Sequence, residues 1–171
     1  MGLLLSAGFG CVGEKEEPEW YLRPGDALPE FEVATIDGKR ISSADSYEAE
    51  MVIVFFNTDC PDCRRELPEI QKRYDENQML AESDRDIYIC IAREEGEADI
   101  VGYWESNHLT LPVSPQPDRH IYSLFASVGI PRIFYARDGK ILRTERRRGG
   151  FLLRRGDLLP ILTNNFRKIR K

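Results

Sequence analysis

Residues 51–56, Met-Val-Ile-Val-Phe-Phe, form an uninterrupted apolar run that is rich in β-branched and aromatic side chains. A short run of this kind is typical of a strand that is buried on both faces of a sheet. Residues 87–92, Ile-Tyr-Ile-Cys-Ile-Ala, form a second run of the same type. Because strands buried on both faces need helices to cover them, the two runs predict an α/β fold with a parallel pair of strands at its centre.

The segments around these runs supply the expected helices and hairpins. Apolar or thiol side chains recur at helical spacing from Cys63 to Tyr74, which predicts a helix over 61–79. Asp37-Gly38 and Asp138-Gly139 each separate two alternating segments, as in β-hairpins. The full predicted order is a hairpin over 31–42, a strand over 51–56, a helix over 61–79, a strand over 87–92, a helix over 98–107, a short helix from about Asp118, a hairpin over 132–144 and a final helix from about Asp157.

The length of 171 residues leaves room for one ordinary domain, and 42% hydrophobic residues are enough to give it a core. We assign residues 25–171 to this domain, with ordered structure beginning at about Trp20. Residues 1–24 are then a separate leader segment. The longest uncharged apolar stretches fall short of the ~18 residues that a membrane-spanning helix needs, which excludes a transmembrane transporter.

The leader segment carries Cys11 behind an apolar stretch that ends in Gly10. This stretch resembles the end of a bacterial lipoprotein signal, in which the cysteine becomes the lipid-bearing first residue of the mature protein. The acidic residues that follow Cys11 predict an unfolded tether. We therefore expect residues 1–24 to be the remnant of a signal with a lipid anchor at Cys11, followed by the tether. The alternative is a cysteine without function on a disordered tail.

The formal net charge of −5 gives the whole chain no general attraction for nucleic acid. The charge is unevenly distributed, because residues 131–171 carry 13 Lys or Arg against 3 Asp or Glu. Charge runs usually face water, so a solvated basic C-terminal region is the simpler interpretation. A docking patch for anionic lipid or for an acidic partner is the alternative.

Cys60 and Cys63 are the two of the four cysteines that lie close together in sequence. In the first turn of a helix, residues three apart have Cα atoms about 5 Å from each other, which is within the range that a disulfide requires. The helix N-terminus favours a thiolate, so Cys60 is predicted to be the attacking thiol. Cys63 lies one turn further along, on the core-facing side, and is predicted to be the resolving thiol.

The surrounding motif, Cys60-Pro61-Asp62-Cys63-Arg64-Arg65-Glu66-Leu67-Pro68, follows the pattern C-x-x-C-[RK]-x-E-x-P. With Gly129-Ile130-Pro131 before the second hairpin, the chain resembles the TlpA/ResA-like group of extracytoplasmic thiol-disulfide oxidoreductases. The resemblance implies a thioredoxin fold, with a central mixed β-sheet flanked by helices and an N-terminal β-hairpin extension. It covers the chain from about Gly25 to the C-terminus.

The resemblance also implies roles for individual residues. Glu66 would accept the proton of Cys63, since Val54 stands where thioredoxins keep a buried acid; the alternative for Glu66 is a solvated helix acid. Pro131 would form a cis peptide bond with Ile130 and face the dithiol. The backbone at Ile130, together with Pro61 and Asp62, would contact the substrate.

Asp59 and Asp62 flank Cys60, where many relatives carry an aromatic residue before the first cysteine. Their negative charges oppose the helix dipole, and Arg64 and Arg65 are expected to compensate in part. Cys90 lies in the middle of a predicted strand and is expected to be a small buried hydrophobic residue. His108 and His120 lack the spacing of metal ligands, and no cofactor is expected.

The function predicted from these features is reduction of disulfides in protein substrates at the cell envelope of a bacterium, by a periplasm-facing or surface lipoprotein. Electrons would come from a membrane dithiol donor. The alternative is a redox-inert binding or assembly lipoprotein in which Cys60 and Cys63 form a structural disulfide. A thiol peroxidase is not favoured, because Thr58 stands at the wrong offset from Cys60 for the peroxidase pattern.

Overall fold

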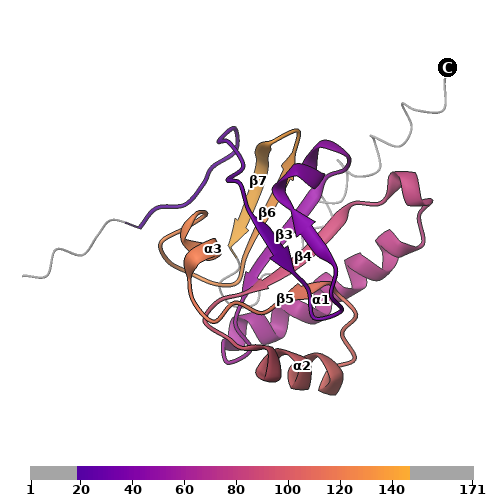
Figure 1. Ribbon diagram of the computed structural model, residues 1–171, viewed down its shortest axis with the longest axis vertical. Coiled ribbons are helices and arrows are strands. Elements are labelled where there is room, and N and C mark those ends of the chain that lie inside the picture. Colours follow the sequence, from indigo (N-terminus) through magenta and orange to yellow (C-terminus); the bar gives the residue numbers. More distant parts are fainter. Residues whose placement is uncertain (1–18, 147–171) are drawn as a thin grey trace, which may run out of the picture.

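The computed structural model describes residues 19–146, which form a five-stranded mixed sheet with helices on its faces and a separate two-stranded hairpin (Figure 1). The strands and helices are β1 (Glu32–Ala34), β2 (Arg40–Ser42), β3 (Met51–Phe56), α1 (Pro61–Gln78), β4 (Ile87–Ala92), α2 (Glu97–Ser106), β5 (Val113–Ser114), α3 (His120–Ser123), β6 (Arg132–Arg137) and β7 (Lys140–Arg146). The strand order in the main sheet is β5-β4-β3-β6-β7. β3, β4 and β5 are parallel, whereas β6 and β7 are antiparallel to their neighbours.

β3 is the central strand, and all six of its residues are buried. Successive side chains of a strand point to opposite faces of a sheet. Accordingly, the odd-numbered residues of β3 belong to one apolar cluster and the even-numbered residues to another. The uninterrupted apolar sequence of this strand therefore reflects two cores, one on each face of the sheet.

The two faces of the sheet are covered by different elements. Helices α1 and α2 supply Leu67, Ile70 and Trp104 to the cluster on the even-numbered face. The other face is covered by the β1–β2 hairpin, which crosses in front of the sheet in Figure 1, and by α3 and the residues that follow it. Phe31 beside β1 and Phe125 after α3 meet edge to face in that second core, with their ring centroids 5.8 Å apart.

The topology brings three loops to one edge of the sheet. Because β3 and β4 are parallel neighbours, the segments 57–60 and 93–96 both leave the sheet at the carboxyl ends of these strands. β6 runs antiparallel to β3, so the segment 127–131 enters the sheet at the same edge. Cys60, which ends the first of these loops, therefore lies beside the loop that ends in Pro131.

The N-terminal segment of the described chain is attached to the loop before β6. Tyr21 pairs with Ala126 in an isolated antiparallel bridge. Trp20 and Ser127 are joined by hydrogen bonds in both directions, from the Ser127 N–H to the Trp20 carbonyl and from the Trp20 N–H to the Ser127 hydroxyl. The described chain is thus attached to the loop before β6 from Trp20 onward, and the predicted domain boundary stays a prediction.

The predicted mixed α/β fold with its N-terminal hairpin is confirmed, and the differences concern short elements. The bounds of β3 and β4 are those expected; α1 ends one residue earlier than expected, and α2 begins and ends one residue earlier than expected. β5 and the 3-10 helices at Ser43–Tyr47 and Glu82–Asp84 were not anticipated. The expected short helix near Asp118 is α3, which has four residues. The lipidation prediction at Cys11 and the predicted final helix lie outside the described residues.

Candidate active site

Cys60 occupies the N-cap of α1, directly before Pro61 at the first helical position. Its Sγ atom donates a hydrogen bond to the carbonyl oxygen of Ile130 over 3.8 Å, and the residue is half-buried. Cys60 is thus held between the start of α1 and the loop before β6. Its partial exposure makes it the thiol of the pair that can meet another molecule.

Cys63 lies in the first turn of α1 and is completely buried, among Leu67, Ile70 and the even-numbered residues of β3. Burial raises the pKa of the Cys63 thiol well above its ordinary value, and the neighbouring Cys60 raises it further. The backbone of Asn57 and the positive charge of Arg93 act in the opposite direction but are outweighed. Cys63 is therefore protonated at neutral pH and needs a proton acceptor before it can attack.

Glu66 lies one turn beyond Cys63 and is buried, with 8% of its surface exposed. Residues three apart on a helix have Cβ atoms about 5–6 Å apart, so Glu66 and Cys63 share one face of α1. The Glu66 carboxylate forms an ion pair with Arg73, with 3.0 Å from Oε1 to Nη2. A neighbouring guanidinium favours the charged form of a carboxylate. The position therefore differs from that of the solvated helix acid considered as the alternative.

Arg73 is a residue of this site that the sequence analysis missed. It stands seven residues after Glu66 on α1, which is two helical turns, and the guanidinium also donates a hydrogen bond to the Tyr135 hydroxyl over 3.1 Å. Tyr135 lies in β6, so Arg73 links the helix that carries the dithiol to the sheet. The signal in the sequence that could have identified Arg73 was its spacing of seven residues from Glu66 within the predicted helix.

The two acids that flank Cys60 are each paired with an arginine of α1. Asp59 lies 3.4 Å from Arg64, and Asp62 is bonded to Arg65 one turn along the helix. The Asp59 side chain is almost fully exposed, whereas that of Asp62 is 35% exposed. Arg64 and Arg65 therefore form ion pairs with the two acids beside Cys60, as expected for residues that compensate their charges.

The loop before β6 presents Ile130 and Pro131 to Cys60. The Ile130–Pro131 peptide bond is cis, as expected from the motif. Gly129 has a φ of +90°, a conformation that side chains other than glycine rarely adopt, and its carbonyl accepts a hydrogen bond from the Tyr122 hydroxyl over 3.0 Å. The glycine in this motif is therefore required by the backbone conformation of the loop.

The three cysteines of the described residues are free thiols in this structure. Cys90 is completely buried and pairs in register with Val54 across β3 and β4. Burial raises the pKa of the Cys90 thiol, which keeps it protonated. Among residues 19–146, no three His, Cys, Asp or Glu side chains are grouped so that they could hold a metal ion.

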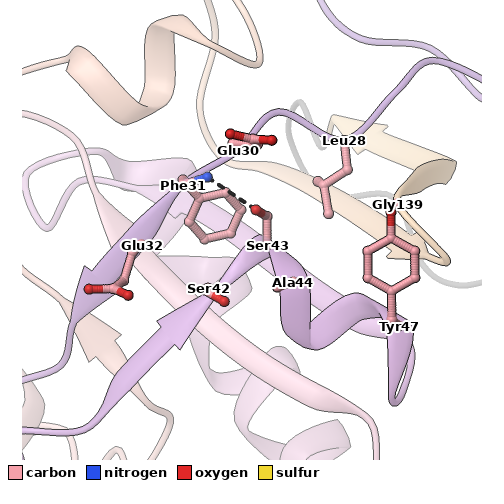
Figure 2. Close-up of a pocket in the computed structure, with 9 residues that line it drawn as sticks. All are labelled: Leu28, Glu30, Phe31, Glu32, Ser42, Ser43, Ala44, Tyr47 and Gly139. Carbon is pink, nitrogen blue, oxygen red and sulfur yellow. Dashed lines mark hydrogen bonds between the residues drawn. The ribbon is translucent and has the colours of Figure 1, made fainter.

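A pocket of about 550 Å³ lies beside the N-terminal hairpin and is lined by residues that include Phe31, Ser43, Tyr47 and Gly139 (Figure 2). The backbone N–H of Phe31 is bonded to the Ser43 hydroxyl within it. Gly139 lies beyond the C-terminal end of β6, whereas Cys60 contacts the loop at the N-terminal end of that strand. The pocket is therefore separate from the dithiol.

Several solved structures with a similar fold are proteins named for thiol-disulfide chemistry. A Bacteroides thetaiotaomicron protein provisionally named a protein disulfide isomerase is 22% identical, with a TM-score of 0.69, and the match covers 88% of this chain and 92% of that one. The thioredoxin domain of a Bacteroides vulgatus thiol-disulfide oxidoreductase is 21% identical, with a TM-score of 0.63 and coverage of 84% and 98%. The exposed lipoprotein thioredoxin of Streptococcus pneumoniae is 21% identical, with a TM-score of 0.61 and coverage of 80% and 99%. At these identities the matches establish the thioredoxin fold.

Comparison of the sequence with protein families identifies the family of the chain. No curated protein gives a significant match to it. The family model of the AhpC/TSA family, however, matches residues 24–142, which is most of the chain and includes both Cys60 and Cys63 as well as Pro131. The chain therefore belongs to the AhpC/TSA family.

Proposed function

We propose that this protein is a thiol-disulfide oxidoreductase of the TlpA/ResA-like type that reduces disulfides in protein substrates. The observation that carries the proposal is the unequal placement of the two thiols. Cys60 is half-buried at the helix N-cap and faces the loop before β6, whereas Cys63 is enclosed one turn below it. This asymmetry suits a pair in which one thiol attacks and the other resolves.

The proposed reaction is two successive thiol-disulfide exchanges. The Cys60 thiolate attacks one sulfur of the substrate disulfide, forms a mixed disulfide and releases the first substrate thiolate. Cys63 then loses its proton and attacks the Cys60 sulfur, which closes the Cys60–Cys63 disulfide and releases the second substrate thiolate. The substrate gains two electrons, and a dithiol donor returns the protein to its reduced form by the reverse exchanges.

Glu66 is the proposed acceptor of the Cys63 proton. It is buried on the same face of α1 as Cys63, and its ion pair with Arg73 supports the ionised form that can accept a proton. Pro61, Asp62 and the backbone at Ile130 border Cys60 and would contact the substrate segment that carries the disulfide. Pro131 fixes the end of that loop against Cys60.

Reductase activity and the reduction potential of the dithiol test this function together. The purified protein is expected to catalyse dithiol-dependent reduction of a model protein disulfide. The potential of the Cys60/Cys63 couple, measured by equilibration with glutathione, is expected closer to the ~−270 mV of thioredoxin than to the ~−120 mV of an oxidant such as DsbA. A protein without turnover whose Cys60–Cys63 disulfide resists reduction would instead support the redox-inert binding lipoprotein.

We propose a bacterial cell-envelope location, with a lipid anchor at Cys11 and a membrane dithiol as the electron donor. The proposal rests on the lipoprotein-like sequence before Cys11 and on the fold shared with an exposed lipoprotein thioredoxin. None of the helices within residues 19–146 has both the length and the apolar character needed to span a bilayer.

The anchor can be tested by metabolic labelling. A lipidating bacterial host that expresses the full-length chain is expected to incorporate labelled palmitate into the protein, because the thiol of Cys11 is the acceptor of the diacylglycerol group. The Cys11→Ser form is expected to remain unlabelled. Equal labelling of the two forms, or of neither, would remove Cys11 as the anchor.

A further inference from the structure

Thr58 lies in the loop between β3 and Cys60, and its polar groups are bound by a distant acid. Its backbone N–H donates to both carboxylate oxygens of Glu95, at 2.9 and 2.8 Å, and its hydroxyl donates to Oε1 of the same carboxylate. Glu95 is 37 residues away in sequence, in the segment that follows β4. The parallel pairing of β3 and β4, visible side by side in Figure 1, brings the two segments together.

The rest of the 57–60 loop is fixed by hydrogen bonds as well. Arg64 of α1 donates to the Thr58 carbonyl. The Asn57 side chain donates to the Arg93 carbonyl over 3.1 Å, and the Cys60 N–H donates to the Asn57 carbonyl over 3.2 Å. The N–H and the carbonyl of Thr58 are thus both bound by side chains from outside the loop, the N–H by Glu95 after β4 and the carbonyl by Arg64 of α1.

Glu95 and Thr58 are each buried, with 7% of their surface exposed. Placing a carboxylate there carries a desolvation penalty, and burial raises the pKa of Glu95 above its ordinary value. Hydrogen bonds from Thr58 oppose that shift. The end of the Glu95 side chain is placed so that its two oxygens receive the N–H and the hydroxyl of Thr58 together.

We propose that Glu95 is a positioning residue for the dithiol exchange: through Thr58 it fixes the loop that sets Cys60 against Ile130 and over Cys63. This inference rests on the proposed function and adds to it a residue from outside the Cys-x-x-Cys motif. A carboxylate that accepts both groups of Thr58 holds the loop in one conformation. Cys63 then meets the Cys60 sulfur in the orientation that closing of the disulfide requires.

Two conservative variants separate positioning from charge. Glu95→Asp keeps the negative charge but shortens the side chain by one methylene, so it cannot reach Thr58 in the same geometry. Glu95→Gln keeps the length; its amide oxygen can accept the Thr58 N–H, and its amide nitrogen can donate to the Thr58 hydroxyl. Glu97→Ala serves as the control, because Glu97 is an exposed acid two residues further on.

The experiment follows the reaction of the reduced protein with the chromogenic disulfide dithionitrobenzoate. Attack by Cys60 releases one thionitrobenzoate, and resolution by Cys63 releases the second, so stopped-flow absorbance gives both rate constants. We expect Glu95→Asp to slow the second release about tenfold, since small displacements of reacting groups reduce rates by factors of this size or more. Glu95→Gln and Glu97→Ala are expected to stay within about twofold of the wild type.

The potential of the Cys60/Cys63 couple gives a second readout. A loosened loop lowers the effective concentration of Cys63 near Cys60, so Glu95→Asp is expected to disfavour the closed disulfide about tenfold, which is a potential about 30 mV less negative. Thermal unfolding by circular dichroism reports on folding separately. A Glu95→Asp protein with a lower melting temperature but an unchanged potential and resolution rate would reduce Glu95 to a structural role and overturn the inference.

The two remaining outcomes are equally decisive. If Glu95→Gln is impaired as much as Glu95→Asp, the charge of Glu95 matters rather than its position, and the inference is wrong. Failure of the proposed function can be distinguished from failure of this inference. A wild-type protein without reductase turnover contradicts that function. The reduction potentials of the Glu95→Asp and Glu95→Gln forms can still be compared in that case, and they test the positioning role of Glu95.

Discussion

Replacement of Cys60 by serine is expected to abolish dithiol-dependent reduction of a model protein disulfide, leaving only the rate of the free dithiol. The serine hydroxyl is not ionised at neutral pH and cannot form a disulfide, so no mixed intermediate arises. Turnover of a protein disulfide such as insulin, followed by turbidity, measures the effect. Because Cys60 is half-buried whereas Cys63 and Cys90 are buried, no other cysteine of residues 19–146 is placed to replace it.

Two other cysteine variants serve as controls for this result. Cys63→Ser is expected to accumulate the mixed disulfide between Cys60 and the substrate, detectable by non-reducing electrophoresis. Cys90→Ala is expected to retain activity, since Cys90 is completely buried in the middle of β4, where it pairs in register with Val54 and cannot meet a substrate. Turnover by the Cys60→Ser protein at the wild-type rate would contradict the proposed mechanism.

The central strands could be predicted from the sequence because their environment leaves a strong pattern. β3 is buried on both faces, so every position from Met51 to Phe56 is apolar, and the observed bounds match those expected. β5 has two residues, Val113 and Ser114, and is a strand only because it pairs with Cys90 and Ile91 of β4. Two residues carry no periodicity, so an element of this kind depends on tertiary pairing that local sequence does not encode.

The candidate site likewise has residues that local sequence predicts and residues that it does not. Cys60, Cys63 and Glu66 lie within one stretch of helix, where spacing alone places them on neighbouring turns. The bond between Glu95 and Thr58 joins segments 37 residues apart, and it exists because β3 and β4 are parallel neighbours. Residues that act through long-range backbone contacts therefore escape a motif-based analysis, even when they lie next to the motif.

The burial of Glu66 with Arg73 changes how its variants should behave. In a solvated position, a change to glutamine would have little consequence for the dithiol. In the observed position, Glu66→Gln preserves size and can still accept a hydrogen bond from Arg73, but it removes the proton acceptor proposed for Cys63. The matched control is Glu69→Gln, which removes the same charge from an exposed position of α1.

Glu66→Gln is expected to leave attack by Cys60 nearly unchanged and to slow resolution by Cys63 about 10²-fold at pH 7, the lower end of general-base effects. The two steps are measured by the successive thionitrobenzoate releases in stopped flow. Glu69→Gln is expected to match the wild type in both. Equal slowing of attack and resolution would indicate a general structural effect rather than the loss of a base.

The pH dependence of the slower resolution in Glu66→Gln identifies the cause of this deficit. Burial raises the pKa of Cys63, so without a base its thiolate fraction, and with it the rate of resolution, grows about tenfold per pH unit across the neutral and mildly alkaline range. With Glu66 as the proton acceptor, resolution in the wild type is expected to be nearly independent of pH over the same range. A deficit of about 10²-fold at pH 7 should therefore fall to about tenfold at pH 8 and nearly vanish at pH 9. A deficit that stays constant with pH would show that Glu66 does not take the proton of Cys63.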